Sequence, residues 1–169
     1  MSTYRWDKYF MDMCSAVSSN SVCLSRQLGA VLVKDKSVVS MGYNGPPRGH
    51  PHCNDLSVLE YHQLPSDSVG CPRQLLGYTS GKGLDICPAG HAERNALVNA
   101  ARLGIRTLGT TLYLNGCIPC KDCLIEIINA GVFELVVLER KKYYDGFSKF
   151  ILSKSSLLVR EPRRDMFGG

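Results

Sequence analysis

The distribution of apolar residues predicts a helix followed by two strands at the start of the chain. Within residues 4–19, "YRWDKYFMDMCSAVSS", the apolar side chains recur at the spacing of one helix face. These positions are Trp6, Tyr9, Phe10, Met13 and Val17. Residues 28–34 and 37–43 are instead runs rich in β-branched side chains. Because only Asp35 and Lys36 separate them, they predict a β-hairpin.

The second half of the chain alternates between helical and strand patterns. The predicted elements are a helix over 91–104, a strand over 110–115, a helix over 119–131, a strand over 133–140, a last helix over 143–155 and a short strand or tail over 157–160. Gly104 and Gly131 are expected to close the first two helices. Pro119 is expected at the first helical position of the second.

This order of elements indicates an α/β protein. The strand–helix–strand unit over 110–138 implies a crossover connection, so its two strands are expected to be parallel. The prediction is a three-layer α-β-α sandwich around a mixed central sheet of about five strands. A chain of 169 residues suits a single domain, here 1–169, with a substantial core.

One long segment, residues 44–87, does not follow the periodic pattern. It carries five of the eight prolines and many glycines, and its sequence shows no core of its own. Irregular segments of this length are usually functional or are held by something other than a core. Residues 44–87 are therefore interpreted as an irregular insert that needs an additional tether.

Composition narrows the class of protein without choosing a function. Hydrophobic residues make up 44% of the chain and charged residues 21%, as in an ordinary globular protein. No apolar run approaches the ~20 residues of a membrane span, and "MSTYRWDKYF" shows no secretory signal, so a cytoplasmic location without membrane partners is predicted. The net charge of +5 favours anionic partners only weakly.

Eight cysteines are the strongest compositional signal. They stand at positions 14, 23, 53, 71, 87, 117, 120 and 123. In a reducing compartment, clustered cysteines are more often metal ligands or reactive thiols than disulfides. Cys14 falls within the first predicted helix and is expected in the core, and Cys117 is expected in the loop before the helix that Pro119 opens.

A candidate catalytic metal site combines "HAE" at 91–93 with "PCKDC" at 119–123. His91, Cys120 and Cys123 supply three zinc ligands and leave the fourth position open, as catalytic zinc sites do. Each ligand lies at the start of a predicted helix, where the helix dipole favours thiolates. Glu93 is not needed as a ligand and is free to act as a proton shuttle.

An alternative grouping joins Cys87 to His91 as a Cys-x-x-x-His site. The His91, Cys120 and Cys123 trio is preferred because it leaves an open metal position with Glu93 beside it. The order H-x-E followed by P-C-x-x-C is a known signature of zinc-dependent nucleobase deaminases. Either half alone is weak evidence, since the second half also occurs in redox pairs and structural zinc sites.

With these motifs the chain resembles the cytidine and deoxycytidylate deaminase superfamily, and most closely the deoxycytidylate (dCMP) deaminase family. The resemblance covers nearly the whole chain. Its segments are "WDKYFM" (6–11), "SVCLSRQLGAVLVKDK" (21–36), "GYNGPPRGHPHC" (42–53), "HAERNA" (91–96) and "GCIPCKDC" (116–123). Free cytidine deaminases differ, because they use Cys where His91 stands. The resemblance implies a cytidine deaminase-like fold and a small nucleotide substrate.

The resemblance also implies a reaction and roles for individual residues. The expected activity is zinc-dependent hydrolysis of dCMP to dUMP and ammonia, which feeds dTMP synthesis, with Glu93 moving protons between water and the base. The backbone N–H of Ala92 is expected to bind the pyrimidine carbonyl. Asn44 resembles the family's sugar-contacting asparagine, although Asn44-Gly45 is also typical of a tight turn.

Further properties follow only from the family resemblance. The loop formed by Gly42, Tyr43, Asn44 and Gly45 is a candidate regulatory site for dCTP and dTTP with Mg²⁺. Many family members are hexamers, so a homo-oligomer is expected. The aromatic side chains of Tyr143, Tyr144, Phe147 and Phe150 are then candidates for either a subunit interface or the core.

A second, structural zinc is a further hypothesis. Family members that look like this chain at Cys23, Cys53, Cys71 and Cys87 carry such an ion in several cases. A closed four-ligand zinc would tether an insert that lacks a core. The hypothesis takes Cys53, Cys71 and Cys87 with either Cys23 or one of His50 and His52; the alternative is that these cysteines are unpaired or part of the core.

Zinc chemistry does not choose the substrate. The basic residues considered for phosphate contacts are Arg26, Arg48, Arg94, Lys121 and Arg140, with the cluster Arg160, Arg163 and Arg164 interpreted as either surface or phosphate-binding. Arg94 departs from the family, which often has an apolar residue or Gln there. Rival functions are deamination of dCTP, guanine or a modified nucleotide, nucleic-acid editing, which the dispersed charge supports only weakly, and a zinc scaffold without catalysis.

Overall fold

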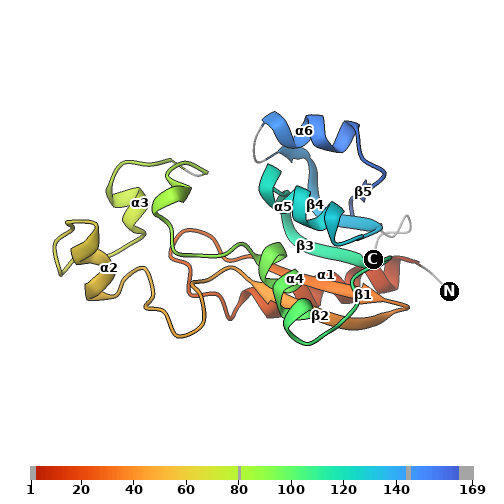
Figure 1. The fold of residues 1–169 in the computed structure, drawn as a ribbon, viewed down its shortest axis with the longest axis horizontal. Helices are drawn as coiled ribbons and strands as arrows, with labels where there is room; N and C mark the ends of the chain where they lie inside the picture. Colours follow the sequence, from red (N-terminus) through yellow and green to blue (C-terminus); the bar gives the residue numbers. More distant parts are fainter. Residues whose placement is uncertain (1–2, 80, 144–145, 164–169) are drawn as a thin grey trace, which may run out of the picture.

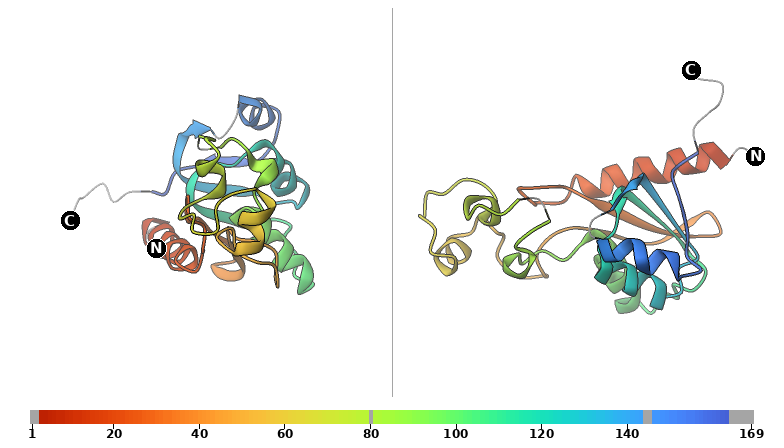
Figure 2. Two further views of the ribbon diagram at one scale, coloured as in Figure 1. Left: turned by 90° about the vertical axis from the view of Figure 1, so that its left-hand side faces the viewer. Right: turned by 90° about the horizontal axis from the view of Figure 1, so that it is seen from above.

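The computed structural model describes residues 3–79, 81–143 and 146–163, and it places a mixed sheet between two layers of helices (Figures 1 and 2). The strand order is β2-β1-β3-β4-β5. The strands are β1 (Gly29–Lys34), β2 (Ser37–Tyr43), β3 (Thr111–Ile118), β4 (Glu134–Tyr143) and β5 (Leu158–Arg160). β1 pairs antiparallel with β2 and β3, whereas β3–β4 and β4–β5 are parallel. The predicted mixed sheet and parallel crossover are confirmed.

Four longer helices cover the two faces of this sheet. They are α1 (Thr3–Ser18), α4 (Ala92–Arg102), α5 (Lys121–Asn129) and α6 (Gly146–Ser153). In the view from above, α1 lies on one face and α4, α5 and α6 on the other (Figure 2). The three-layer architecture agrees with the prediction. Within the described part of the chain, no helix combines the length and apolar character needed to cross a membrane.

The interior strand β1 is covered on both faces, which explains why its sequence is apolar without alternation. Val31 and Val33 pack with Phe10 of α1 on one face, while Ala30 and Leu32 pack with the other helical layer. All five side chains are buried. A strand covered on both faces is therefore expected to be a continuous apolar run. Cys14 of α1 is also fully buried, as expected of a core residue.

The insert over 44–87 projects from one end of the sheet (Figures 1 and 2). It contains the short helices α2 (Leu56–Tyr61) and α3 (Pro72–Leu75) and a single 3₁₀ turn over Leu84–Ile86. Two backbone hydrogen bonds close its base, from Gly45 N to Gly90 O at 3.1 Å and from Gly90 N to Gly45 O at 2.8 Å. The two ends of the insert are therefore fixed beside the start of α4.

The segment between β3 and α5 corrects two predictions. Cys117 lies in β3 rather than in a loop, because the strand runs to Ile118 through a shift in its pairing with β4 after Leu114. Pro119 precedes the helix instead of opening it, since Cys120 is the N-cap of α5. The irregular pairing carries the end of β3 toward the segment that begins α5.

Candidate metal centre and substrate pocket

Three ligand side chains meet where two helices begin. His91 is the N-cap of α4, Cys120 is the N-cap of α5, and Cys123 lies in the first turn of α5. The Nδ1 atom of His91 is 3.5 Å from the Sγ of Cys120 and 3.3 Å from the Sγ of Cys123. Among the described residues this is the one His/Cys/Asp/Glu group whose ligand atoms all lie within 4.8 Å of one another.

The three side chains shift one another's pKa values because they lie in contact. The hydrogen bond with Cys120 raises the pKa of His91. The hydrogen bond from Cys123, opposed by burial and assisted by His91, lowers the pKa of the Cys120 thiol well below its ordinary value. The same sharing with Cys120, together with burial, raises the pKa of Cys123. One imidazole and two buried sulfurs at mutual contact distance fit zinc, which favours nitrogen and thiolate ligands.

Glu93 is the buried acid beside this centre. Its side chain is only 4% exposed, and its Oε2 atom has no hydrogen-bond partner within the part of the chain that the structure describes. Burial raises the pKa of Glu93, although the nearby positive charge of His91 acts in the opposite direction. A carboxyl group with a raised pKa exchanges protons more readily near neutral pH, which suits a proton shuttle.

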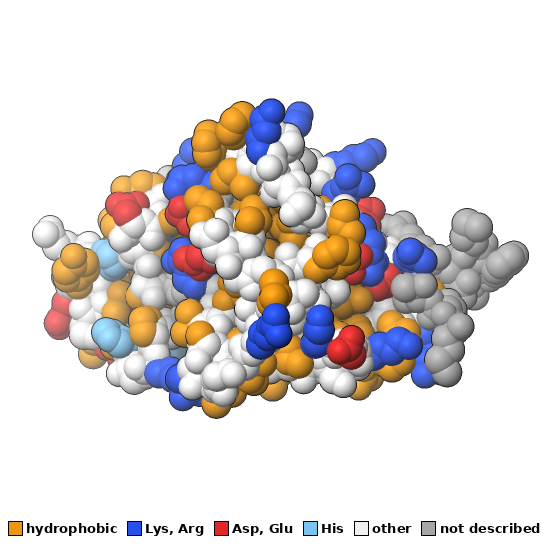
Figure 3. Space-filling model, turned by 45° about the vertical axis from the view of Figure 1, so that its right-hand side comes forward, with side chains coloured by type: hydrophobic (Ala, Val, Ile, Leu, Met, Phe, Trp, Pro, Cys, Tyr) orange, Lys and Arg blue, Asp and Glu red, His pale blue; other side chains and the backbone are white. Residues whose placement is uncertain are grey.

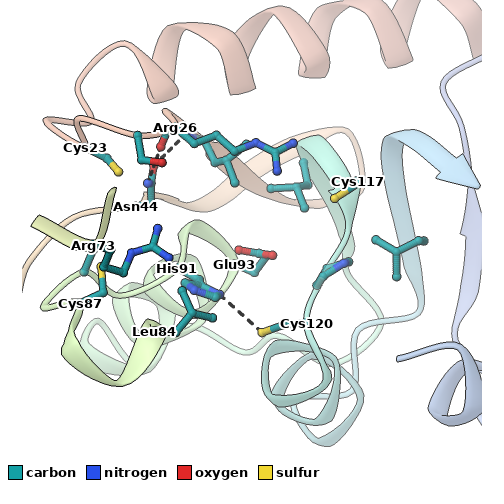
Figure 4. Close-up of a pocket in the computed structure, with 16 residues that line it drawn as sticks. Cys23, Arg26, Asn44, Arg73, Leu84, Cys87, His91, Glu93, Cys117 and Cys120 are labelled. Atoms are coloured by element: carbon teal, nitrogen blue, oxygen red, sulfur yellow. Dashed lines mark hydrogen bonds between the residues drawn. The ribbon is translucent and has the colours of Figure 1, made fainter. Parts of the chain in front are cut away.

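A single pocket joins two of the three candidate metal ligands, His91 and Cys120, to the rest of the site (Figure 4). His91, Glu93 and Cys120 line it together with Asn44, whereas Ala92 is fully buried at the start of α4. The walls come from the segment before β1, from the insert and from the end of β3. The cavity can therefore hold a small molecule against both the acid and the metal ligands.

A comparison with known protein families identifies the family of this chain. Residues 4–139 match the model of the cytidine and deoxycytidylate deaminase zinc-binding region. The chain belongs to the cytidine and deoxycytidylate deaminase family.

The chain is similar to several proteins described as deoxycytidylate deaminases. It is 39% identical over 156 residues to a deoxycytidylate deaminase of Schizosaccharomyces pombe, covering 92% of this chain. The chain spans only 44% of the length of that relative. It is also 35% identical over 141 residues to a deoxycytidylate deaminase of Mycobacterium phage D29, covering 80% of this chain and 96% of the phage protein.

Solved structures confirm the deaminase fold. The dCMP deaminase of cyanophage S-TIM5 in complex with dCMP and dUMP superposes with a TM-score of 0.66 at 25% identity. The match covers 91% of this chain and 94% of the phage chain. The cytidine deaminase-like fold predicted from sequence is therefore confirmed.

Asn44 takes part in a network of hydrogen bonds within the chain. Its Oδ1 atom accepts bonds from Leu28 N at 2.7 Å and from Ser21 Oγ at 2.9 Å, and its Nδ2 atom donates to Arg26 O at 2.7 Å. Asn44 thus holds the segment before β1 in place. One Nδ2 hydrogen is left over, so the predicted sugar contact needs only that hydrogen or an exchange of partners.

In the candidate regulatory loop, Gly42, Asn44 and Gly45 are buried and Tyr43 is exposed. Gly42 lies within β2, where an added Cβ would stand 2.3 Å from Ala96 N, so its small size is required by the close approach of α4. Asn95 of α4 donates to the backbone oxygen of Tyr43 at 2.8 Å. These contacts give the loop a structural role; nothing in them tests the predicted binding of a regulatory triphosphate.

The four remaining candidate ligands surround a second, mostly apolar cavity. Cys23, Cys53, Cys71 and Cys87 all line it. Burial raises the pKa of the Cys53 thiol, and the charges of the other three cysteines raise it further. The four sulfurs are more widely spaced than the catalytic trio. The alternates His50 and His52 are exposed and do not line this cavity.

Most of the basic candidates lie outside the substrate pocket. Arg94 forms an ion pair with Glu126 of α5 at 2.8 Å, Arg48 donates to Asn99 Oδ1 at 3.0 Å, and Lys121 pairs with Asp122. Arg140 is exposed on β4. Arg26 is the member of the five that lines the pocket.

Two further candidates lie at the carboxyl end of the chain. Arg160 and Arg163 are hydrogen-bonded to the buried Asp7, so they hold α1 against the sheet, and Arg164 lies outside the described residues.

The aromatic candidates for a subunit interface or the core lie in and before α6. Phe147 and Phe150 of α6 are 56% and 54% exposed, with ring centroids 5.3 Å apart. Tyr144 and the side chain of Tyr143 lie outside the described residues.

Among the charged residues that line the pocket, the sequence prediction missed Arg73. Arg73, from α3 of the insert, lines both the substrate pocket and the cysteine cavity. Its position two residues after Cys71 is the only signal that the sequence offers. On the face shown in Figure 3, lysine and arginine side chains are scattered among hydrophobic and acidic ones, in contrast to the basic stripe of a nucleic-acid surface.

Proposed function

We propose that the chain catalyses zinc-dependent hydrolytic deamination of a cytosine nucleotide, converting dCMP to dUMP and ammonia. The observation that carries the proposal is a buried acid, Glu93, that lines one pocket with His91 and Cys120, two members of the His91, Cys120 and Cys123 group. Relatives described as deoxycytidylate deaminases and a similar phage enzyme solved with dCMP and dUMP support the choice of substrate.

His91, Cys120 and Cys123 would hold the zinc ion. When bound, zinc supplies Lewis acidity that lowers the pKa of water and so provides a nucleophile at neutral pH. The remaining chemistry belongs to Glu93. Its carboxylate accepts a proton as the water oxygen bonds to C4 of cytosine, and it then donates that proton to N3.

The same carboxylate completes the reaction. It takes the second proton from the added oxygen and delivers it to the amino nitrogen, after which the C4–N bond breaks and ammonia leaves. The product has a carbonyl at C4, so one water is consumed and one ammonia is released. The raised pKa of buried Glu93 suits both directions of transfer. The Ala92 N–H, at the start of α4, is the proposed donor to the pyrimidine carbonyl.

A panel of dCMP, dCTP, deoxycytidine, CMP and GMP tests the proposal by ultraviolet absorbance and ammonia release. We expect dCMP to react fastest. Glu93→Ala should keep its zinc and lose at least about 100-fold in kcat. Zinc-loaded protein that releases no ammonia from any cytosine nucleotide would refute the substrate class. Unchanged turnover in Glu93→Ala would remove Glu93 from the reaction.

We also propose that Cys23, Cys53, Cys71 and Cys87 bind a structural zinc. The shared cavity supports these four residues over His50 and His52. Zinc would draw the sulfurs closer and tether the insert. Metal analysis of intact protein should find two zinc ions per chain, and Cys53→Ser should retain one with Glu93-dependent chemistry still measurable. One zinc per intact chain contradicts the second site.

Other predictions rest on the family resemblance or on the sequence alone. Regulation by dCTP and dTTP with Mg²⁺, assembly into a homo-oligomer such as a hexamer, and a cytoplasmic location remain predictions. So does the description of residues 1–169 as a single domain. The exposed pair Phe147 and Phe150 supports a subunit contact over a core role for these two aromatics.

A further inference from the structure

Arg73 is a buried positive charge with few partners. It lies in α3 and is only 9% exposed. Its Nη1 donates to the backbone oxygen of Lys82 at 2.5 Å. Its Nε is buried and has no hydrogen-bond partner in the described portion of the chain. A guanidinium has five N–H donors, so the bond to Lys82 leaves it largely unsatisfied.

A charge in this state needs an anion. Burying an unpaired charge is costly, and buried arginines are normally compensated by carboxylates or phosphates. The ion pairs found among the described residues join other arginines and lysines to carboxylates, and none involves Arg73. The missing counter-charge therefore has to come from outside the described chain, or from a thiolate of the neighbouring cysteines.

The position of Arg73 indicates which anion it receives. Its side chain reaches from the insert into the substrate pocket and points toward the space between Asn44 and His91 (Figure 4). Cys120 and the acid Glu93 lie farther across the same pocket (Figure 4). A nucleotide with its base at Glu93 would direct its phosphate away from the reacting atoms, toward the arginine-bearing wall.

We propose that Arg73 binds the 5′-phosphate of the nucleotide and so selects nucleotides over nucleosides. This inference rests on the proposed function and deepens it, since it assigns recognition of the phosphate to the insert and the chemistry to α4 and α5. The planar guanidinium suits bidentate binding of a phosphate. Arg26, which lines the same pocket, provides a second positive charge.

The test compares dCMP with deoxycytidine, which lacks the phosphate, in wild type, Arg73→Gln and Arg73→Lys. Arg73→Gln should lower kcat/KM for dCMP about 10- to 100-fold, mainly through KM, and change the value for deoxycytidine by less than about threefold. Arg73→Lys should restore part of the loss. Arg48→Gln is the matched control, because it makes the same change at a residue of the insert that lies outside the pocket. It should leave kcat/KM unchanged for both dCMP and deoxycytidine.

The alternative role predicts a different pattern. In this alternative, Arg73 serves only to neutralise the thiolates of Cys23, Cys53, Cys71 and Cys87. In that case Arg73→Gln will lower kcat/KM equally for dCMP and deoxycytidine, or release zinc, and either result overturns the proposal. An unchanged preference for dCMP overturns it as well. If wild type does not deaminate dCMP, the proposed function fails, and calorimetry with inorganic phosphate and dUMP decides separately. Weaker binding to Arg73→Gln would support a phosphate site, and equal binding would reject it.

Discussion

At the scale of single residues, Asn44 has a structural role in addition to its predicted sugar contact. The sequence predicts that it contacts a sugar, and in the structure its amide joins Ser21, Arg26 and Leu28. These bonds fix the segment that carries Arg26 and Cys23 to the pocket wall. Asn44 therefore lines the pocket and also holds in place the segment that forms one of its walls.

Removal of this amide should therefore reduce stability as well as binding. We expect Asn44→Ala to lower the free energy of unfolding by about 2–4 kcal/mol, because partly buried backbone groups of Leu28 and Arg26 lose their partners. Urea denaturation of zinc-loaded protein measures the loss. Asn20→Ala, at an exposed asparagine, is the control and should change stability by less than about 0.5 kcal/mol. Equal stability of the two variants would contradict the structural role of Asn44.

At the scale of elements, the metal centre depends on how α4 lies on the sheet. Gly42 of β2 permits this contact, since an added Cβ would stand 2.3 Å from Ala96 N and 2.7 Å from Ala92 O. About one helical turn past the ligands, the ion pair between Arg94 and Glu126 joins α4 to α5. Both contacts fix the relative position of the helices that begin with His91 and Cys120.

The Gly42→Ala variant tests this dependence. The new methyl group must push α4 away from β2, so we expect a loss of about 1–3 kcal/mol in stability and weaker zinc binding. Chelator competition followed optically and thermal unfolding measure the two effects. Gly146→Ala is a suitable control, because nothing lies within 4 Å of the added atom. Zinc affinity equal to that of wild type would show that the α4–β2 contact does not position the ligands.

At the scale of the whole molecule, a charged cluster joins the two ends of the described chain. Asp7 of α1 is fully buried and accepts hydrogen bonds from Arg160 at 2.6 Å, from the Arg163 backbone N–H at 2.8 Å and from Tyr113 at 2.9 Å. Burial acts to raise the pKa of Asp7, but these bonds outweigh it and hold the pKa below the usual range. The cluster joins α1, β3 and β5.

This lowered pKa gives the stability a pH dependence of known sign. A carboxyl group with a depressed folded-state pKa stabilises the protein above its unfolded value, about 3.9, and that contribution is lost as the pH falls toward the folded value. We expect Asp7→Asn to be less stable than wild type by about 2–4 kcal/mol at pH 7, with a gap that narrows below about pH 4. Urea unfolding of both proteins across about pH 3–7 measures the gap, and the difference cancels effects of zinc release. A constant gap would contradict the assignment.

Much of this architecture is predictable, because periodic segments carry their own signal. Apolar spacing predicts the helices that begin near His91 and Cys120, as do Gly104 and Gly131, which both adopt positive φ. Residue type and order predict the metal-binding trio, since zinc restricts both. Boundaries are less accurate: the shift in pairing after Leu114 extends β3 through Cys117, and no local pattern encodes that shift.

The parts that the sequence does not predict depend on contacts between distant segments. Arg94 and Arg48 are candidates for phosphate binding because of their charge, yet Glu126 and Asn99 engage them. Arg73 carries the same charge but differs in its surroundings, which only the folded insert determines. These arginines differ in whether another side chain binds the guanidinium. The spacing of residues in the sequence does not predict that difference.

The two backbone hydrogen bonds between Gly45 and Gly90 bear on how the insert can change during evolution of the family. They hold the two ends of the insert together whatever lies between them, and loop-closure entropy rises only slowly with length. The segment can therefore gain or lose residues with little cost to the sheet. Exchange of this one loop is therefore a route to a different substrate preference that leaves the residues at the helix starts unchanged.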